Sequence, residues 1–151
     1  PDVLARGGIR VFAHALDVPK LAPELQREVT ALQAGDAVEV GPVRVRAMHT
    51  PGHTPGSTCW HVDGAEGALF AGDTVFVNAC GRCDLAGGDP EQMFQSLRRV
   101  AELPLGVKLY PGHDYGDVKV STVDREKRNN PYFQKLHSME DFVSWRMRPR
   151  R

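Results

Sequence analysis

Residues His49 to Ser57, which read HTPGHTPGS, limit the possible folds of this chain more than any other segment. They follow an alternating run, Val43 to Met48, that is typical of a strand with one buried and one solvated face. The prolines, glycines and threonines of the segment favour a tight turn at the end of that strand. Such a turn holds a side chain at a fixed angle above a sheet, and the side chain at its centre is His53.

The same arrangement occurs twice more along the chain. Residues 68–74, ALFAGDT, predict a buried strand that ends at Asp73. Residues 108–115, KLYPGHDY, predict another strand, which ends at a Pro-Gly turn before His113. Three strands are therefore each expected to deliver one metal-competent side chain at a tight turn.

These three side chains are of the types that bind a borderline divalent metal, which prefers imidazole nitrogens and carboxylate oxygens. A carboxylate is a natural bridge between two ions, because each of its oxygens can serve one of them. Two ions bridged in this way, about 3.5–4 Å apart, can generate a hydroxide and stabilise a developing oxyanion. Histidine and aspartate are also common in ordinary turns, but their recurrence at three strand ends favours a metal site.

The order of the motifs TPGHTPGS, LFAGDTVF and LYPGHDYG resembles the second half of the metallo-β-lactamase superfamily. The closest similarity is to its glyoxalase II (hydroxyacylglutathione hydrolase) and persulfide dioxygenase branch, with support from residues 79–84, 121–123 and 130–132. The resemblance runs from about residue 8 to residue 142. It implies an α/β fold, the αββα sandwich, of which this chain would form the C-terminal half with mostly antiparallel strands and flanking helices. Residues 1–151 would then be a single, partial metallo-hydrolase domain.

The resemblance also implies a ligand set for two zinc ions. His53 corresponds to a ligand of the first metal, Asp73 to the bridging carboxylate and His113 to a ligand of the second metal. The family uses an upstream HxHxDH motif as well, and no His-x-His occurs in this sequence, which begins at Pro1. Since a catalytic zinc usually takes three ligands from the protein, three residues are too few for two ions. We therefore interpret the sequence as the C-terminal piece of a longer protein.

Three further residues are candidates for supporting roles. By the resemblance, Tyr115 lies near a thiol substrate and Arg82 lies on a loop near the pocket, where it could bind a glutathione-like carboxylate. Asp114 is suited to orient the neighbouring imidazole of His113. The alternative for Tyr115 and Arg82 is surface packing, and for Asp114 an exposed turn position.

The expected activity is hydrolysis of a thioester, such as a hydroxyacyl-glutathione, by a metal-activated hydroxide, with no serine or cysteine nucleophile. One alternative is a mononuclear iron persulfide dioxygenase, in which His53 and Asp73 would be ligands and His113 would not. Residues 88–93 and 130–133 look more like the glyoxalase II-type bacterial hydrolases, and this resemblance favours the hydrolase. Another alternative is a non-catalytic half-domain lacking the HxHxDH ligands, whose exposed apolar sheet face would promote homo-oligomers.

Composition narrows the expected partners and compartment. With 19 basic and 19 acidic residues the formal net charge is zero, which argues against a nucleic-acid or membrane-surface role. A small-molecule thioester or thiol-derived substrate is expected instead. The three cysteines, Cys59, Cys80 and Cys83, form no disulfide framework, so a reducing, cytoplasmic compartment is expected. The lone CxxC pair favours two loop cysteines over a redox or zinc motif.

The periodicities predict the remaining elements. Strands are expected at 7–13, 37–40, 43–48, 57–62, 68–72 and 107–110. A helical turn or a loose helix is expected within 17–32, and helices are expected from Asp89, from Ser121 and from Ser138. A loop is expected over 78–88, and a solvated basic tail is expected at Arg146, Arg148, Arg150 and Arg151.

Overall fold

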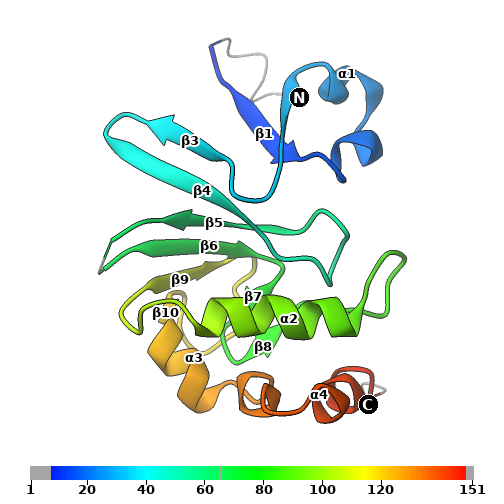
Figure 1. Cartoon of the computed structure of the whole chain (residues 1–151), viewed down its shortest axis with the longest axis vertical. Coiled ribbons are helices and arrows are strands. Elements are labelled where there is room, and N and C mark those ends of the chain that lie inside the picture. Colours follow the sequence, from blue (N-terminus) through cyan, green and yellow to red (C-terminus); the bar gives the residue numbers. More distant parts are fainter. Residues whose placement is uncertain (1–7, 65, 149–151) are drawn as a thin grey trace.

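A six-stranded sheet forms the centre of the computed structural model, which describes residues 8–64 and 66–148 (Figure 1). Its strand order is β10-β9-β6-β5-β4-β3. The strands are β3 (Ala37–Val40), β4 (Val43–His49), β5 (Thr58–Val62), β6 (Ala68–Gly72), β9 (Lys108–Pro111) and β10 (Ser121–Thr122). The β6–β9 pair is parallel and the other neighbours are antiparallel. The predicted α/β fold with mostly antiparallel strands is confirmed.

Helices pack together against one face of this sheet (Figure 1). They are α2 (Pro90–Ala101), α3 (Val123–Asn129) and α4 (Met139–Arg146), with a 3₁₀ turn η3 (Phe133–Lys135) between the last two. The helices and the sheet share one core, whose fully buried members include Cys59, Leu69, Met93, Leu97, Val100 and Phe142. Helix α2 therefore contributes its apolar side chains to this core.

The helix starts follow local capping chemistry. The Asp89 side chain accepts hydrogen bonds from the backbone of Glu91 and Gln92, and the Ser138 side chain accepts one from Asp141. Both predicted starts are confirmed. The predicted cap of α3 is wrong, because Thr122 rather than Ser121 accepts the capping bond, from Arg125.

The N-terminal part is a small parallel sheet with short helical turns. Strand β1 (Val11–His14) pairs with β2 (Val29–Leu32), and η2 (Val18–Lys20) and α1 (Pro23–Gln26) connect them. The helical turn predicted within 17–32 is therefore confirmed, whereas the alternative of a loose helix over the whole segment is wrong at its end. Its near-helical apolar spacing is overridden because the β-branched residues at 29 and 30 pair with a distant strand. The predicted start of the first strand, Gly7, lies outside the described residues.

The segment predicted as a loop from residue 78 begins inside a small hairpin of β7 (Val75–Phe76) and β8 (Ala79–Cys80). Asn78 lies in its turn with φ of 59°, a left-handed conformation that asparagine tolerates better than most residues. Strands of two residues carry too little periodicity to be detected in a sequence.

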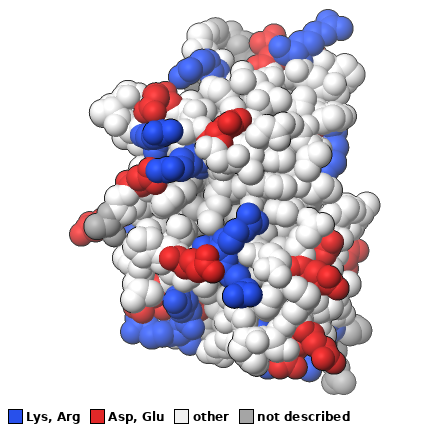
Figure 2. Space-filling model, viewed as in Figure 1, with Lys and Arg blue, Asp and Glu red and all other residues white. Residues whose placement is uncertain are grey.

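The predicted solvated tail is wrong at one position. Arg146 is the last residue of α4 and is only 4% exposed, because this end of the helix packs inward, whereas Arg148 is exposed. Arg150 and Arg151 lie outside the described residues. Figure 2 shows basic and acidic side chains interspersed on the face in view. Within the described part of the chain, no helix has both the length and the apolarity that a bilayer span requires.

Candidate metal centre

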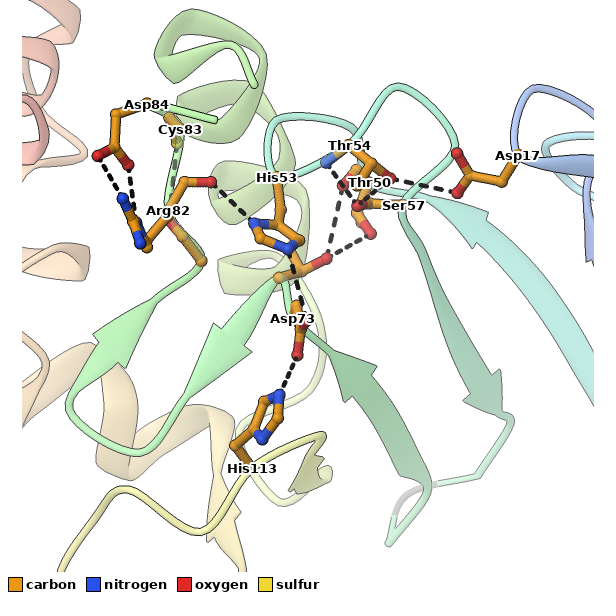
Figure 3. Close-up of polar contacts among 12 residues, drawn as sticks. Asp17, Thr50, His53, Thr54, Ser57, Asp73, Arg82, Cys83, Asp84 and His113 are labelled. Carbon is orange, nitrogen blue, oxygen red and sulfur yellow. Dashed lines mark hydrogen bonds and ion pairs between the residues drawn. The ribbon is translucent and has the colours of Figure 1, made fainter. Parts of the chain in front are cut away.

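The structure brings His53, Asp73 and His113 together at one edge of the main sheet (Figure 3). Nε2 of His53 lies 3.4 Å from Oδ2 of Asp73, and Nε2 of His113 lies 3.3 Å from Oδ1 of the same carboxylate. The two imidazoles therefore approach the two different oxygens of one side chain. Their assignment as metal ligands remains a prediction, but the geometry suits a bridging carboxylate.

Strand direction explains why three distant turns meet. Strands β4 and β6 run the same way because each is antiparallel to β5, which lies between them, and β9 is parallel to β6. Their C-terminal ends thus share one edge of the sheet, and each end is followed by a turn that carries one of the three residues. Gly112 lets the last turn approach closely, since a Cβ there would lie 2.9 Å from Oδ1 of Asp73.

The turn that carries His53 is held by its own polar groups. The His49 ring donates from Nε2 to the Pro55 carbonyl over 2.7 Å. The Ser57 hydroxyl accepts from the backbone N–H of Thr54 over 3.0 Å. These bonds fix the loop on either side of His53, and they give the predicted turn its physical basis.

The ring of His53 is oriented by a backbone carbonyl. Its Nδ1 lies 2.9 Å from the Arg82 carbonyl oxygen, which can only accept, so Nδ1 carries the proton. The lone pair of a neutral ring is then on Nε2, which faces Asp73. A carbonyl in this position is a common orienting partner of metal-binding histidines.

The ring of His113 is held differently, by aromatic packing. It stacks on Tyr115 with centroids 4.9 Å apart and an interplanar angle of 6°, and it meets the Phe76 ring edge-on at 5.8 Å. Its side chain is 49% exposed, compared with 20% for His53. The two histidines therefore differ in how firmly they are held.

His53, Asp73 and His113 would supply only part of the ligands that two metal ions need. With Asp73 as a bridge, one ion would receive His53 and a carboxylate oxygen, and the other would receive His113 and the second oxygen. No group of three or more His, Cys, Asp or Glu side chains able to hold a single ion occurs among residues 8–64 and 66–148. By the chemistry of their donor atoms, His53, Asp73 and His113 fit part of a metal centre.

A cavity of about 520 Å³ opens over these residues. It is lined by His53, Asp73, Phe76, Ala79, Cys80, Arg82, His113 and Tyr115. The predicted substrate-binding residues thus share one cavity with the candidate ligands. Asp114 is exposed and does not line this cavity, so its predicted role beside His113 stays a prediction.

The side chain of Arg82 is occupied by an ion pair. It donates to both oxygens of Asp84, at 3.0 and 2.8 Å, and in Figure 3 it points away from His53. This guanidinium holds the pKa of Asp84 below its usual range, and Asp84 in turn raises the pKa of Arg82. Arg82 therefore contacts His53 through its backbone carbonyl, while its side chain lies at the rim of the cavity, paired with Asp84.

Sequence reasoning missed Phe76, which forms an aromatic wall of the cavity with Tyr115, with centroids 5.2 Å apart. The available signal was the apolar run that follows Asp73. Cys83 of the CxxC pair is buried, and burial raises the pKa of its thiol to about 11, an effect that the nearby Arg146 opposes. A buried, protonated thiol favours the structural interpretation of this cysteine.

Curated relatives match much of this chain. Probable polyketide biosynthesis zinc-dependent hydrolase BaeB of Bacillus velezensis is 38% identical over 123 residues, which are 81% of this chain and 53% of that protein. A hydroxyacylglutathione hydrolase of Maricaulis maris is 36% identical over 75% of this chain and 41% of its own length. Persulfide dioxygenase ETHE1 of Bos taurus is 34% identical over 74% and 43%. The chain spans about half the length of the curated relatives it matches.

Solved structures share the fold. A metallo-beta-lactamase of Staphylococcus aureus superposes with a TM-score of 0.86 at 27% identity, over 99% of this chain and 48% of that one. ETHE1 of Myxococcus xanthus gives 0.82 at 30% identity, over 99% and 63%. TTHA1623 in a di-iron-bound form gives 0.69 at 30% identity, over 87% and 68%. The family model of the metallo-beta-lactamase superfamily matches residues 1–113, and with these relatives it shows that the chain belongs to that superfamily.

Proposed function

We propose that this chain carries part of the catalytic centre of a metal-dependent hydrolase that cleaves a thioester such as a hydroxyacyl-glutathione. The observation that carries the proposal is the approach of His53 and His113 to the two oxygens of Asp73, at 3.4 and 3.3 Å. The match to a zinc-dependent hydrolase and to a hydroxyacylglutathione hydrolase supports the reaction class.

The residues of this chain would have distinct tasks in such a centre. His53 and His113 would each give Nε2 to one ion, and Asp73 would give one oxygen to each. When bound, the ions supply a water of lowered pKa and positive charge for a developing oxyanion. The Arg82 carbonyl keeps the His53 ring oriented, so the lone pair need not reorganise when a metal binds.

The cavity walls suggest how a substrate would be held. Tyr115 is 69% exposed and would present an aromatic face and a hydroxyl to the substrate, while Phe76 excludes water behind it. The Arg82 guanidinium would bind a substrate carboxylate by exchanging it for Asp84. Substrate selectivity would then depend on the strength of that internal ion pair.

A mononuclear iron persulfide dioxygenase is the second candidate, and the unequal histidines favour it. His53 is fixed by a carbonyl hydrogen bond, whereas His113 is half-exposed and packs on Tyr115. That asymmetry suits a centre in which His53 and Asp73 are ligands and His113 contacts the substrate. The similarity to persulfide dioxygenase ETHE1 agrees with this reading.

The metal content of the purified chain, measured together with the two activities, distinguishes the hydrolase from the dioxygenase. Zinc and iron content would be measured by plasma mass spectrometry for the wild type and for His53→Ala, Asp73→Asn and His113→Ala, with the exposed His137→Ala as the matched control. Thioester hydrolysis and oxygen uptake with a glutathione persulfide would be assayed on the same samples. His137→Ala should behave as the wild type.

Each outcome assigns the function. Zinc that depends on all three site residues, with thioester hydrolysis, supports the hydrolase. One iron per chain that survives His113→Ala, with oxygen uptake, supports the dioxygenase. A wild type that retains neither metal would refute a catalytic role for the chain by itself and would support the non-catalytic half-domain.

A further inference from the structure

Arg146 is a buried arginine for which the proposed function has no role. It lies at the end of α4 and is 4% exposed. Among the described residues it forms no ion pair with a carboxylate, and its Nη2 is buried without a hydrogen-bond partner. Asp84 interacts with this charge only at longer range, and a buried charge with no carboxylate in direct contact is costly, so its retention here needs a further compensating interaction.

That interaction is made with the loop behind the metal centre. Nε of Arg146 donates to the Gly81 carbonyl over 2.7 Å, a hydrogen bond between residues 65 positions apart in the chain. The guanidinium also lies over the Tyr132 ring, 5.9 Å from its centroid, and close to the Cys83 thiol. A charge-assisted bond to a carbonyl and a cation–π contact offset part of the desolvation cost.

The loop that Arg146 holds has little freedom on its other side. Gly81 packs so closely against the end of β6 that a Cβ there would lie 2.0 Å from the Asp73 carbonyl oxygen and 3.0 Å from Cβ of His53. Its N–H donates to the Thr74 carbonyl over 3.3 Å. The residue is thus clamped between the strand end that carries Asp73 and the guanidinium of Arg146.

The next carbonyl along this clamped loop is the one that orients His53. Arg82 follows Gly81 directly, and its oxygen accepts from Nδ1 of His53 at 2.9 Å. We propose that Arg146 is a positioning residue: by holding the Gly81 carbonyl it sets the adjacent Arg82 carbonyl, which keeps His53 in the Nδ1–H tautomer with Nε2 directed at Asp73. The effect on metal affinity rests on the proposed function, whereas the effect on the tautomer does not.

The test compares three variants. Arg146→Met keeps an unbranched stem and removes every donor, while Arg146→Lys keeps one charged donor that can reach a carbonyl. Arg148→Met is the matched control, because Arg148 lies two residues further on and is exposed. The first readout is the tautomer of neutral His53 in the metal-free protein, from the ¹⁵N and ¹³C chemical shifts of its ring. The second is zinc affinity, measured by chelator competition.

We expect Arg146→Met to populate the Nε2–H tautomer of His53 and to weaken zinc binding roughly 10- to 100-fold, the usual effect of losing a partner that orients a ligand. Arg146→Lys should restore part of both, and Arg148→Met should change neither. A folded Arg146→Met protein with the wild-type tautomer would overturn the inference. The inference would also be overturned if His53 of the wild-type protein carried its proton on Nε2. That measurement does not depend on whether a variant folds.

The two proposals fail separately. If wild-type protein binds no zinc but Arg146→Met still changes the tautomer, the metal function fails and the positioning role stands. If zinc binds equally well to the wild type and to Arg146→Met, and the tautomer is the same, the metal function stands and the positioning role fails.

Discussion

The buried carboxylate of Glu126 offers a quantitative test of what holds the cavity wall in place. Glu126 is fully buried. It accepts from the backbone N–H of Asn78 at 2.9 Å, from Nδ2 of Asn130 at 2.8 Å and from the Ser121 hydroxyl. One side chain of α3 thus connects β10 with the turn of the β7–β8 hairpin, which carries Phe76. We predict that replacing Glu126 destabilises this corner strongly.

The magnitude follows from the three donors. Glu126→Leu leaves the Asn78 N–H and the Ser121 hydroxyl without an acceptor and takes one from Nδ2 of Asn130, which keeps the Ala79 carbonyl at 3.0 Å. Ser121 and Asn130 are themselves buried, at 3% and 0% exposed. Each unsatisfied buried donor costs about 1–3 kcal/mol, so the free energy of unfolding should fall by about 3–6 kcal/mol, allowing for partial relaxation. Glu126→Gln can keep an oxygen for Asn78 and Asn130 and turn its amide to Ser121 as a donor, so it should lose about 1–2 kcal/mol.

The assay is urea unfolding at neutral pH, analysed by linear extrapolation. Glu28→Gln is the control, because Glu28 is exposed and its loss of charge should change stability by less than about 0.5 kcal/mol. The reasoning would be refuted by a Glu126→Leu protein within about 1 kcal/mol of the wild type. It would also be refuted if Gln and Leu destabilised equally, since only Gln can replace the hydrogen bonds.

Three further predictions concern the loop behind the candidate metal centre. Gly81→Ala should lower the free energy of unfolding by about 1–3 kcal/mol in thermal unfolding, because its Cβ would lie 2.0 Å from the Asp73 carbonyl oxygen; a wild-type melting temperature would contradict this. Burial raises the pKa of Cys83 from 9.0 to about 11, so the unfolded chain loses this proton first and stability should fall as pH rises between those values. Cys83→Ala should flatten that decline in urea unfolding over the same pH range. Asp84→Asn releases the Arg82 guanidinium from its ion pair and should therefore increase the affinity for a small carboxylate ligand, measured by calorimetry. An unchanged affinity would show that the Arg82 side chain does not bind the carboxylate.

The candidate ligands could be found in the sequence because their signals are local. A turn built from Pro, Gly and Thr directly after an alternating run is encoded within about ten residues, and so is the Asp89 cap that starts α2. Both depend on bonds between near neighbours in the chain. His53, Asp73 and His113 are each recognisable as candidate ligands for this reason. The local sequence of the three turns does not indicate that these side chains lie close together in space.

Their meeting was decided by tertiary structure, through the shared direction of β4, β6 and β9. The same holds for β2, whose helical spacing was overridden by pairing with β1, and for the hydrogen bond between Arg146 and Gly81. The partners at these places lie outside a local sequence window, 65 positions apart for Arg146 and Gly81, and a periodicity cannot report a partner that lies outside its window. The sequence by itself determined which chemical groups stand at the strand ends, and only the packed sheet and helices decided which of them face one another and what holds them there.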